Sequence, residues 1–152
     1  MDKNTINWKR GRGKLGLLKP LLGSWIAEQK SEMGYIKCTR TFKQVLNGNY
    51  IELNAKWEFG GKIYEEMAIF GIEKDTITFW SFTSDGKKSN GYLANAFDVH
   101  PDAICFEAQM PAGLARMIYW PDQKSGFRWA VENKVKNGWN RFTEHSYKSI
   151  FL

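Results

Sequence analysis

Residues 50–59, Tyr-Ile-Glu-Leu-Asn-Ala-Lys-Trp-Glu-Phe, contain the pattern that decides the fold. Apolar and polar side chains alternate along the whole segment. The apolar positions are Ile51, Leu53, Ala55, Trp57 and Phe59, and the polar positions between them are Glu52, Asn54, Lys56 and Glu58. Because successive side chains of a strand point to opposite faces, the segment predicts a strand with one buried and one solvated face.

Turn signals lie on both sides of this strand. Asn47-Gly48 precedes it, and both residues tolerate a positive φ, so the pair predicts a type I′ hairpin to a strand over 35–45. Gly60-Gly61 follows it and predicts a turn into a strand over 63–73. Asn137-Gly138 is a second hairpin signal near the end of the chain.

Short alternating segments with similar spacing fill the rest of the chain, which is typical of an all-β sandwich or barrel. The predicted strands cover 24–30, 35–45, 50–59, 63–73, 76–83, 89–99, 103–109, 114–120, 126–136 and 139–149. A flat sheet of about ten strands would have two open edges and a wet apolar face, and closing it removes both. We therefore predict a single antiparallel up-and-down β-barrel, whose interior is wide enough for a ligand.

The chain divides into a basic leader, residues 1–16, and a barrel domain, residues 17–152. Leucines around Pro20 predict one short helical turn at the start of the barrel domain. The formal net charge of the protein is +6, and six basic residues against one acidic residue lie within residues 1–20. A solvated basic tail is favoured over a nucleic-acid-binding face, because the charge does not cover the barrel itself.

Two cysteines, Cys38 and Cys105, do not make a disulfide framework in 152 residues, and no Cys/His spacing suits a metal. No apolar secretion signal follows Met1 and no apolar stretch is long enough for a membrane span, which favours the cytoplasm. The phosphate-loop, nucleophile-elbow and HExxH motifs are missing from the sequence. We predict no catalytic residue, no cofactor and no metal.

Gly23-Ser24-Trp25, after the predicted helical turn, resembles the opening of many calycins, the superfamily of lipocalin-like barrels. Residues 40–52 and 138–147 look like the corresponding segments of the DUF1579-type family of lipocalin-like proteins, and the resemblance spans roughly residues 17–149. It implies a lipocalin-like barrel in which the tryptophan plugs the closed end. That family has no established activity, so the resemblance implies no catalytic or binding residue. Nitrobindin-type haem barrels share the Gly-x-Trp opening, but their haem-site motif has no match in this chain.

Arg40 lies in phase with Cys38 and Phe42 on the face of strand 35–45 that is predicted to point inward. A charge in an apolar row must be paired or must bind an anion, because an unpaired buried charge is costly. A guanidinium binds a carboxylate with two parallel hydrogen bonds, which suits an acidic ligand. The alternative, slightly favoured, is an ion pair with a glutamate on a neighbouring strand.

Other inward candidates are mainly aromatic, and core filling is the favoured role for such residues. His145 could be a general base or an axial haem ligand, but a hydrogen-bonded structural histidine is the favoured interpretation. The complete set of predicted lumen residues is Arg40, Trp57, Tyr92, Arg116, Tyr119, Trp129 and His145.

Three function classes remain open. The leading hypothesis is a binding protein for a small apolar or amphipathic molecule, with Arg40 or Arg116 at its polar end. The alternative is a decarboxylase- or isomerase-type enzyme that uses Tyr119, Arg116 and Glu132 in the lumen. An interaction protein that touches nucleic acid or an anionic membrane through the leader comes last. The expected partner is a small molecule, with a homodimer possible and nucleic acid not expected.

Overall fold

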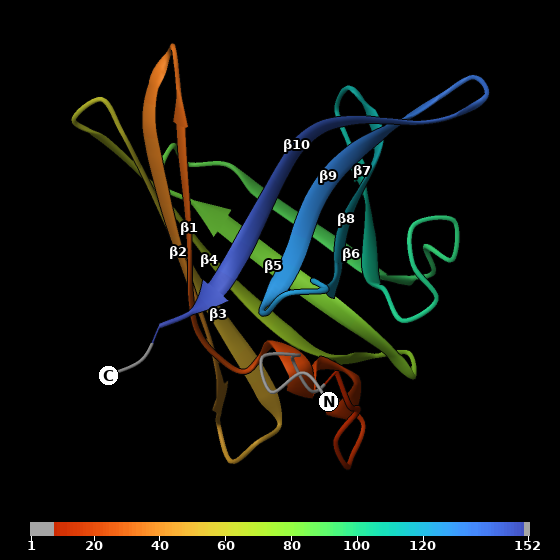
Figure 1. Cartoon of the computed structure of the whole chain (residues 1–152). Coiled ribbons are helices and arrows are strands. Elements are labelled where there is room, and N and C mark those ends of the chain that lie inside the picture. The colour runs from red at the N-terminus through yellow and green to blue at the C-terminus, as the bar shows by residue number, and fades with distance from the viewer. Residues whose placement is uncertain (1–7, 151–152) are drawn as a thin grey trace.

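The computed structural model describes residues 8–150, which form one closed barrel of ten antiparallel strands with a short 3₁₀ helix before it (Figure 1). The elements in chain order are η1 (Gly16–Leu21), β1 (Gly23–Ser31), β2 (Gly34–Val45), β3 (Tyr50–Phe59), β4 (Lys62–Glu73), β5 (Thr76–Thr83), β6 (Lys88–Ala94), β7 (Ile104–Met110), β8 (Gly113–Pro121), β9 (Phe127–Val135) and β10 (Gly138–Ser149). Each strand pairs with its neighbours in sequence, and β10 returns to β1. The predicted all-β up-and-down barrel is confirmed.

The alternation in β3 places one row of side chains inside the barrel, as its sequence predicts. Ile51, Leu53 and Ala55 are buried and belong to the main apolar core. Their neighbours Glu52 and Lys56 face outward and pair with lysine and glutamate side chains on the outer wall. The inward row therefore forms the core, and the outward row keeps this wall hydrated.

The closed end of the barrel lies over η1, at the bottom of Figure 1. Leu18 and Leu21 of η1 are almost completely buried in the core. The indole of Trp25 packs edge-on against Phe127, with 4.8 Å between ring centroids, and its N–H donates to the Leu21 carbonyl at 2.8 Å. The predicted helical turn and the tryptophan at the closed end are both present.

The described part of the basic leader also packs on the closed end. Trp8 donates its indole N–H to the Asp102 carbonyl at 2.8 Å and lies tilted against Phe127, with 6.4 Å between ring centroids, while Leu15 packs against the core. The amide of Gly11 donates to the carbonyl of Gly16 at 2.7 Å, which closes a compact loop. The chain from residue 8 onward is therefore packed on the closed end and is not a free tail, although Lys9, Arg10, Arg12 and Lys14 are exposed to solvent. Residues 1–7 lie outside the described residues.

One predicted strand is too long. The prediction of strand 89–99 is wrong beyond Ala94, where β6 ends and residues 95–103 form a loop along the outer wall. Amides of Val99 and His100 donate to the Ala96 carbonyl, so this segment turns instead of pairing. The carboxylate of Asp98 binds Arg116 on β8, which holds the loop away from the sheet ladder.

The two hairpin signals behave differently. Asn47 and Gly48 both have positive φ, and the Asn49 amide donates to the Leu46 carbonyl, as the predicted type I′ turn requires. Near the C-terminus, β9 ends at Val135 and β10 begins at Gly138, so the connecting residues are 136–137. That turn lies one residue earlier than the sequence signal.

The barrel has one weak seam. Among residues 8–150, β1 pairs with β10 at two positions, Trp25 with Ser149 and Ile26 with Lys148, whereas β1 pairs with β2 along its whole length. Above these two pairs the strands diverge, as Figure 1 shows on either side of the barrel axis. The barrel is therefore closed firmly near η1 and opens toward the opposite end.

Replacement of Gly126 by alanine should destabilise the barrel at the point where β9 begins. Gly126 has φ 72°, and a Cβ there would lie 1.8 Å from the Tyr147 carbonyl oxygen. Left-handed strain and the clash with the β10 backbone together cost roughly 2–5 kcal/mol. Urea unfolding measures the change. The matched control is Gly86→Ala, which shares the positive φ but meets no atom within 4 Å, so only about 1 kcal/mol should be lost. Equal losses would contradict the clash.

Candidate functional site

A cavity of about 540 Å³ occupies the open half of the barrel. Most of the side chains around it are apolar, and it reaches the turn between β7 and β8. The bordering residues are Arg40, Trp57, Tyr64, Glu66, Phe79, Thr83, Ser89, Phe106, Ala108, Met110, Ala112, Gly113, Ala115, Arg116, Met117, Trp129, Val131, Asn133 and Phe142. A mostly apolar hollow with a few polar groups has the character of a small-molecule site.

Arg40 is the fully buried charge at this cavity. It lies in the inward row of β2, and none of its surface is exposed. Its Nε donates to the hydroxyl of Tyr147 at 3.1 Å, and Nη1 donates to the hydroxyl of Tyr119 at 3.0 Å. Its Nη2 has no hydrogen-bond partner within residues 8–150. One donor of the guanidinium fork is therefore left for another acceptor.

The expected ion pair between Arg40 and a glutamate on a neighbouring strand is not formed. Within the described chain, every ion pair involves other residues. Glu66 of β4 borders the same cavity, but its carboxylate accepts a hydrogen bond from Ser81. Burial lowers the pKa of Arg40, whereas Tyr119, Tyr147 and then Glu66 raise it, and the net shift is upward. The guanidinium therefore stays charged at neutral pH.

Aromatic rings surround the guanidinium. The Arg40 Cζ lies 4.4 Å from the ring centroid of Trp129 and 5.3 Å from that of Trp57. Cation–π contacts of this kind stabilise a desolvated charge by up to about 2 kcal/mol each. They do not supply a lone pair to Nη2, so a hydrogen-bond acceptor is still needed there.

Two predicted lumen residues lie inside the barrel behind the cavity wall. Tyr119 is completely buried, and burial, only partly offset by Arg40, raises its pKa to about 12, so it is a neutral donor and acceptor at pH 7. His145 packs 5.6 Å from Trp129 between ring centroids, and burial followed by the charge of Arg40 lowers its pKa. Neither residue borders the cavity, so both act on the site through Arg40 and Trp129.

Two other predicted lumen residues point outward. Tyr92 is 56 % exposed and pairs with Glu107 on the outer wall, so its assignment to the lumen is wrong. Arg116 is among the residues that border the cavity, but its guanidinium extends outward, in phase with Ile118 and Trp120. The outer face of β8 is apolar because loop 95–103 covers Ile118 and Trp120 in a second apolar cluster. In the sequence, this outer face therefore has the pattern of a core face.

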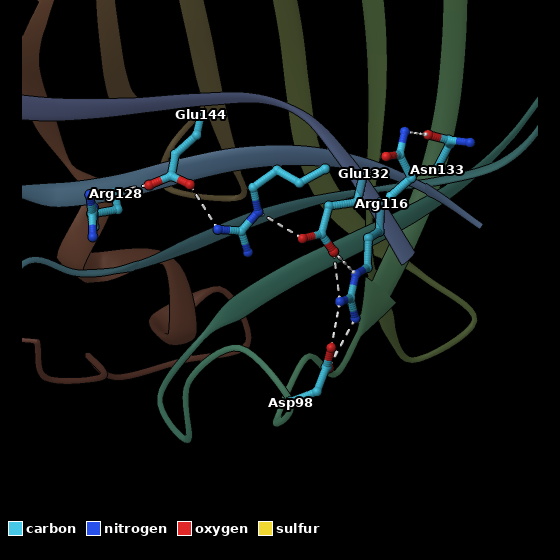
Figure 2. Close-up of polar contacts among 8 residues, drawn as sticks. Asp98, Arg116, Arg128, Glu132, Asn133 and Glu144 are labelled. Atoms are coloured by element: carbon cyan, nitrogen blue, oxygen red, sulfur yellow. Dashed lines mark hydrogen bonds and ion pairs between the residues drawn. The ribbon is translucent and has the colours of Figure 1, made fainter. Parts of the chain in front are cut away.

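Arg116 belongs to an ionic network on the outer wall (Figure 2). It binds the buried carboxylate of Glu132 through Nε at 2.7 Å and both oxygens of Asp98 through its two Nη atoms. Arg141 binds Glu132 at 2.8 Å and also Glu144, which pairs with Arg128. Because Tyr119 lies inside and the other two residues lie outside, the wall separates the trio Tyr119, Arg116 and Glu132.

Several residues of the site were not among the predicted lumen residues. Tyr147 donates its hydroxyl to Cys38 Sγ at 3.0 Å and accepts from Arg40, and Glu66 supplies an acidic group at the cavity. Alternation could have revealed both residues. Glu66 is in phase with the inward Ala68 and Phe70, and Tyr147 is in phase with His145, which was predicted to lie in the lumen. Phe142 reaches the cavity through a bulge between Arg141 and Thr143, which strict alternation along β10 does not reveal.

No cluster of His, Cys, Asp and Glu suited to a metal ion is found within residues 8–150. The two cysteines are free and buried. Over the same residues, no helix combines the length and apolar character that crossing a bilayer requires. The chain matches no protein-family model and no curated protein.

The stability of the protein should fall above pH 10 because of the buried tyrosines. In the unfolded chain a tyrosine ionises near pH 10, whereas the folded pKa of Tyr119 is about 12. The unfolded state therefore binds fewer protons between these values, so the free energy of unfolding falls with rising pH, by up to ~3 kcal/mol for this group. Urea unfolding at pH 8–11.5 measures the slope. Tyr119→Phe should reduce this slope, and a slope identical to that of the wild-type protein would contradict the assignment.

Replacement of Arg116 by methionine should destabilise the fold through the outer network. Glu132 would stay buried with Arg141 as its remaining cationic partner, and broken buried pairs cost about 3–5 kcal/mol. Arg128→Met is the matched control, because it removes a half-exposed pair with Glu144 and should cost less than about 1 kcal/mol. Thermal or urea unfolding of both variants tests this. Equal small losses would show that the network contributes little.

Proposed function

We propose that the protein binds a small amphipathic molecule in the barrel lumen, with the ligand's carboxylate on Arg40 and its apolar body against the aromatic wall. The observation that carries this proposal is a completely buried arginine at the cavity, whose Nη2 finds no partner among residues 8–150. A buried donor that lacks an acceptor costs roughly 1–3 kcal/mol, more for a charged group. A ligand carboxylate would supply that acceptor and compensate the charge.

The rest of the cavity supports an apolar ligand body. Its volume of about 540 Å³ lies within the usual range of small-molecule sites, above the lower bound of roughly 300 Å³. Phe79, Phe106 and Met117 line the inner wall, and Met110 and Phe142 lie toward the mouth. Thioether and phenyl side chains adapt to ligands of different shape, which favours a class of acids over a single one.

Kinship with the calycins, and with the DUF1579-type family in particular, is part of the proposal. The supporting features are the ten-stranded barrel, the 3₁₀ turn before β1 and the plugging Trp25. We also propose the cytoplasm as the site of action. Cys38 lies inside the barrel and Cys105 outside, both as buried thiols, and such thiols persist in a reducing compartment.

An enzyme of the decarboxylase or isomerase type has less support. The three residues proposed for that chemistry do not converge, because the barrel wall separates Tyr119 from the ion pair of Arg116 and Glu132. General acid–base catalysis requires groups within hydrogen-bond reach of one reacting atom. Binding is therefore the function that the geometry supports best.

The test compares decanoate with decanamide, a neutral molecule of nearly the same shape. Isothermal titration calorimetry should show that wild-type protein binds the acid about ten-fold or more tightly than the amide, since a hydrogen bond to a charged group contributes roughly 1.5–3 kcal/mol. Arg40→Met should abolish this preference and keep the amide affinity. Arg128→Met removes a charge from the outer wall and should leave both affinities unchanged. Equal binding of acid and amide by wild-type protein, or no binding of either, would overturn the proposal.

A further inference from the structure

The hairpin turns at the open end of the barrel carry exposed apolar side chains. Figure 1 shows these tips gathered at the end opposite η1. We define the rim as residues 30–35, 59–63, 84–88, 109–113 and 134–138, which flank the turns. Its exposed apolar side chains are Met33, Tyr35, Phe59, Ile63, Met110 and Val135, and Phe142 is 60 % exposed beside them at the cavity mouth.

The rim is also basic. Its lysines are Lys30, Lys62, Lys87, Lys88, Lys134 and Lys136, and its acidic residues are Glu32 and Asp85, which is six against two. Asp85 already pairs with Lys87 at 3.8 Å, so one of the two acidic groups is compensated within the rim. The open end therefore combines apolar contact area with a surplus of positive charge.

This combination favours one kind of partner. Hydrophobic side chains next to lysines are typical of surfaces that enter the interface of anionic membranes, where each basic residue adds to the attraction. A second copy of the chain is disfavoured, because two like-charged rims repel when they face each other. The bilayer is also where amphipathic acids concentrate, so a mouth that touches it would exchange such a ligand without exposing it to water.

We propose that the rim docks on the surface of an anionic bilayer, with the mouth of the lumen toward the lipid. This surface goes beyond the proposed binding function, and docking itself does not require Arg40. The exposed apolar tips enter the headgroup region, and the rim lysines bind lipid phosphates. The basic closed end, with Arg12 and Lys14, faces away from the bilayer in this orientation.

The experiment is flotation of the full chain with vesicles of phosphatidylcholine alone and of phosphatidylcholine with 30 % phosphatidylglycerol. We expect binding to the anionic vesicles that is at least about ten-fold stronger than to the neutral vesicles. Two double variants test the rim. Ile63→Ser with Val135→Ser removes exposed apolar tips that do not border the cavity, and Lys62→Glu with Lys136→Glu reverses charge. Each should weaken anionic-vesicle binding at least ten-fold.

Matched controls keep the result specific to the rim. Phe97→Ser removes an exposed phenylalanine from loop 95–103, and Arg12→Glu with Lys14→Glu reverses charge at the closed end; both should bind as wild type. Loss of binding in the closed-end variant with full binding in the rim variants would overturn the proposal. The proposal would also be overturned if the wild-type protein bound no vesicles. A dimer seen by analytical ultracentrifugation that becomes monomeric in the rim variants would overturn it as well. Arg40→Met should float as wild type, so failure of ligand binding and failure of docking are distinguishable.

Discussion

A side chain on a barrel strand has only two directions, into the lumen or out of it, and this constraint decides where each charge of the protein can act. Arg40 points inward and is surrounded by rings and phenol hydroxyls, and one of its nitrogens has no hydrogen-bond partner in the described part of the chain. Arg116 points outward and is covered by a loop, with carboxylates on both sides. Two buried arginines thus differ in their hydrogen-bond partners because their strands present them to opposite faces.

The two arginines differ in how their buried charge is compensated. The outer network satisfies each of its buried charges, which is how ionic groups persist in an apolar setting. The inner guanidinium is held by neutral hydroxyl acceptors and by aromatic rings, so its positive charge is stabilised without being neutralised. A carboxylate of the protein bound to Nη2 would compete with an anionic ligand, and Glu66, the carboxylate at the same cavity, accepts a hydrogen bond from Ser81 instead.

Sequence reasoning reached the fold because most strands have one polar face. β3 alternates strictly, and so its inward row could be assigned from the letters alone. In β8 and β9 both faces are apolar, because loop 95–103 covers Ile118, Trp120 and Ala130 from outside. Periodicity cannot tell an inner core from an outer one, and for this reason the sequence alone leaves open whether Arg116 points into the lumen or out of it. The same loop explains the overlong sixth strand, since the segment after Ala94 leaves the sheet ladder and its Asp98 is bound to Arg116 of β8.

One end of the barrel is packed with side chains, and the other end contains the cavity. At the closed end, η1, Trp25 and Phe127 fill the interior, and β1 meets β10 there. Toward the open end β1 and β10 separate and the cavity begins. Arg40 lies near the boundary between the packed core and the cavity. A charge at that boundary is shielded from water by the rings around it and yet borders the lumen. The packed floor thus fixes the guanidinium in place, and the open half leaves room for the apolar part of a ligand.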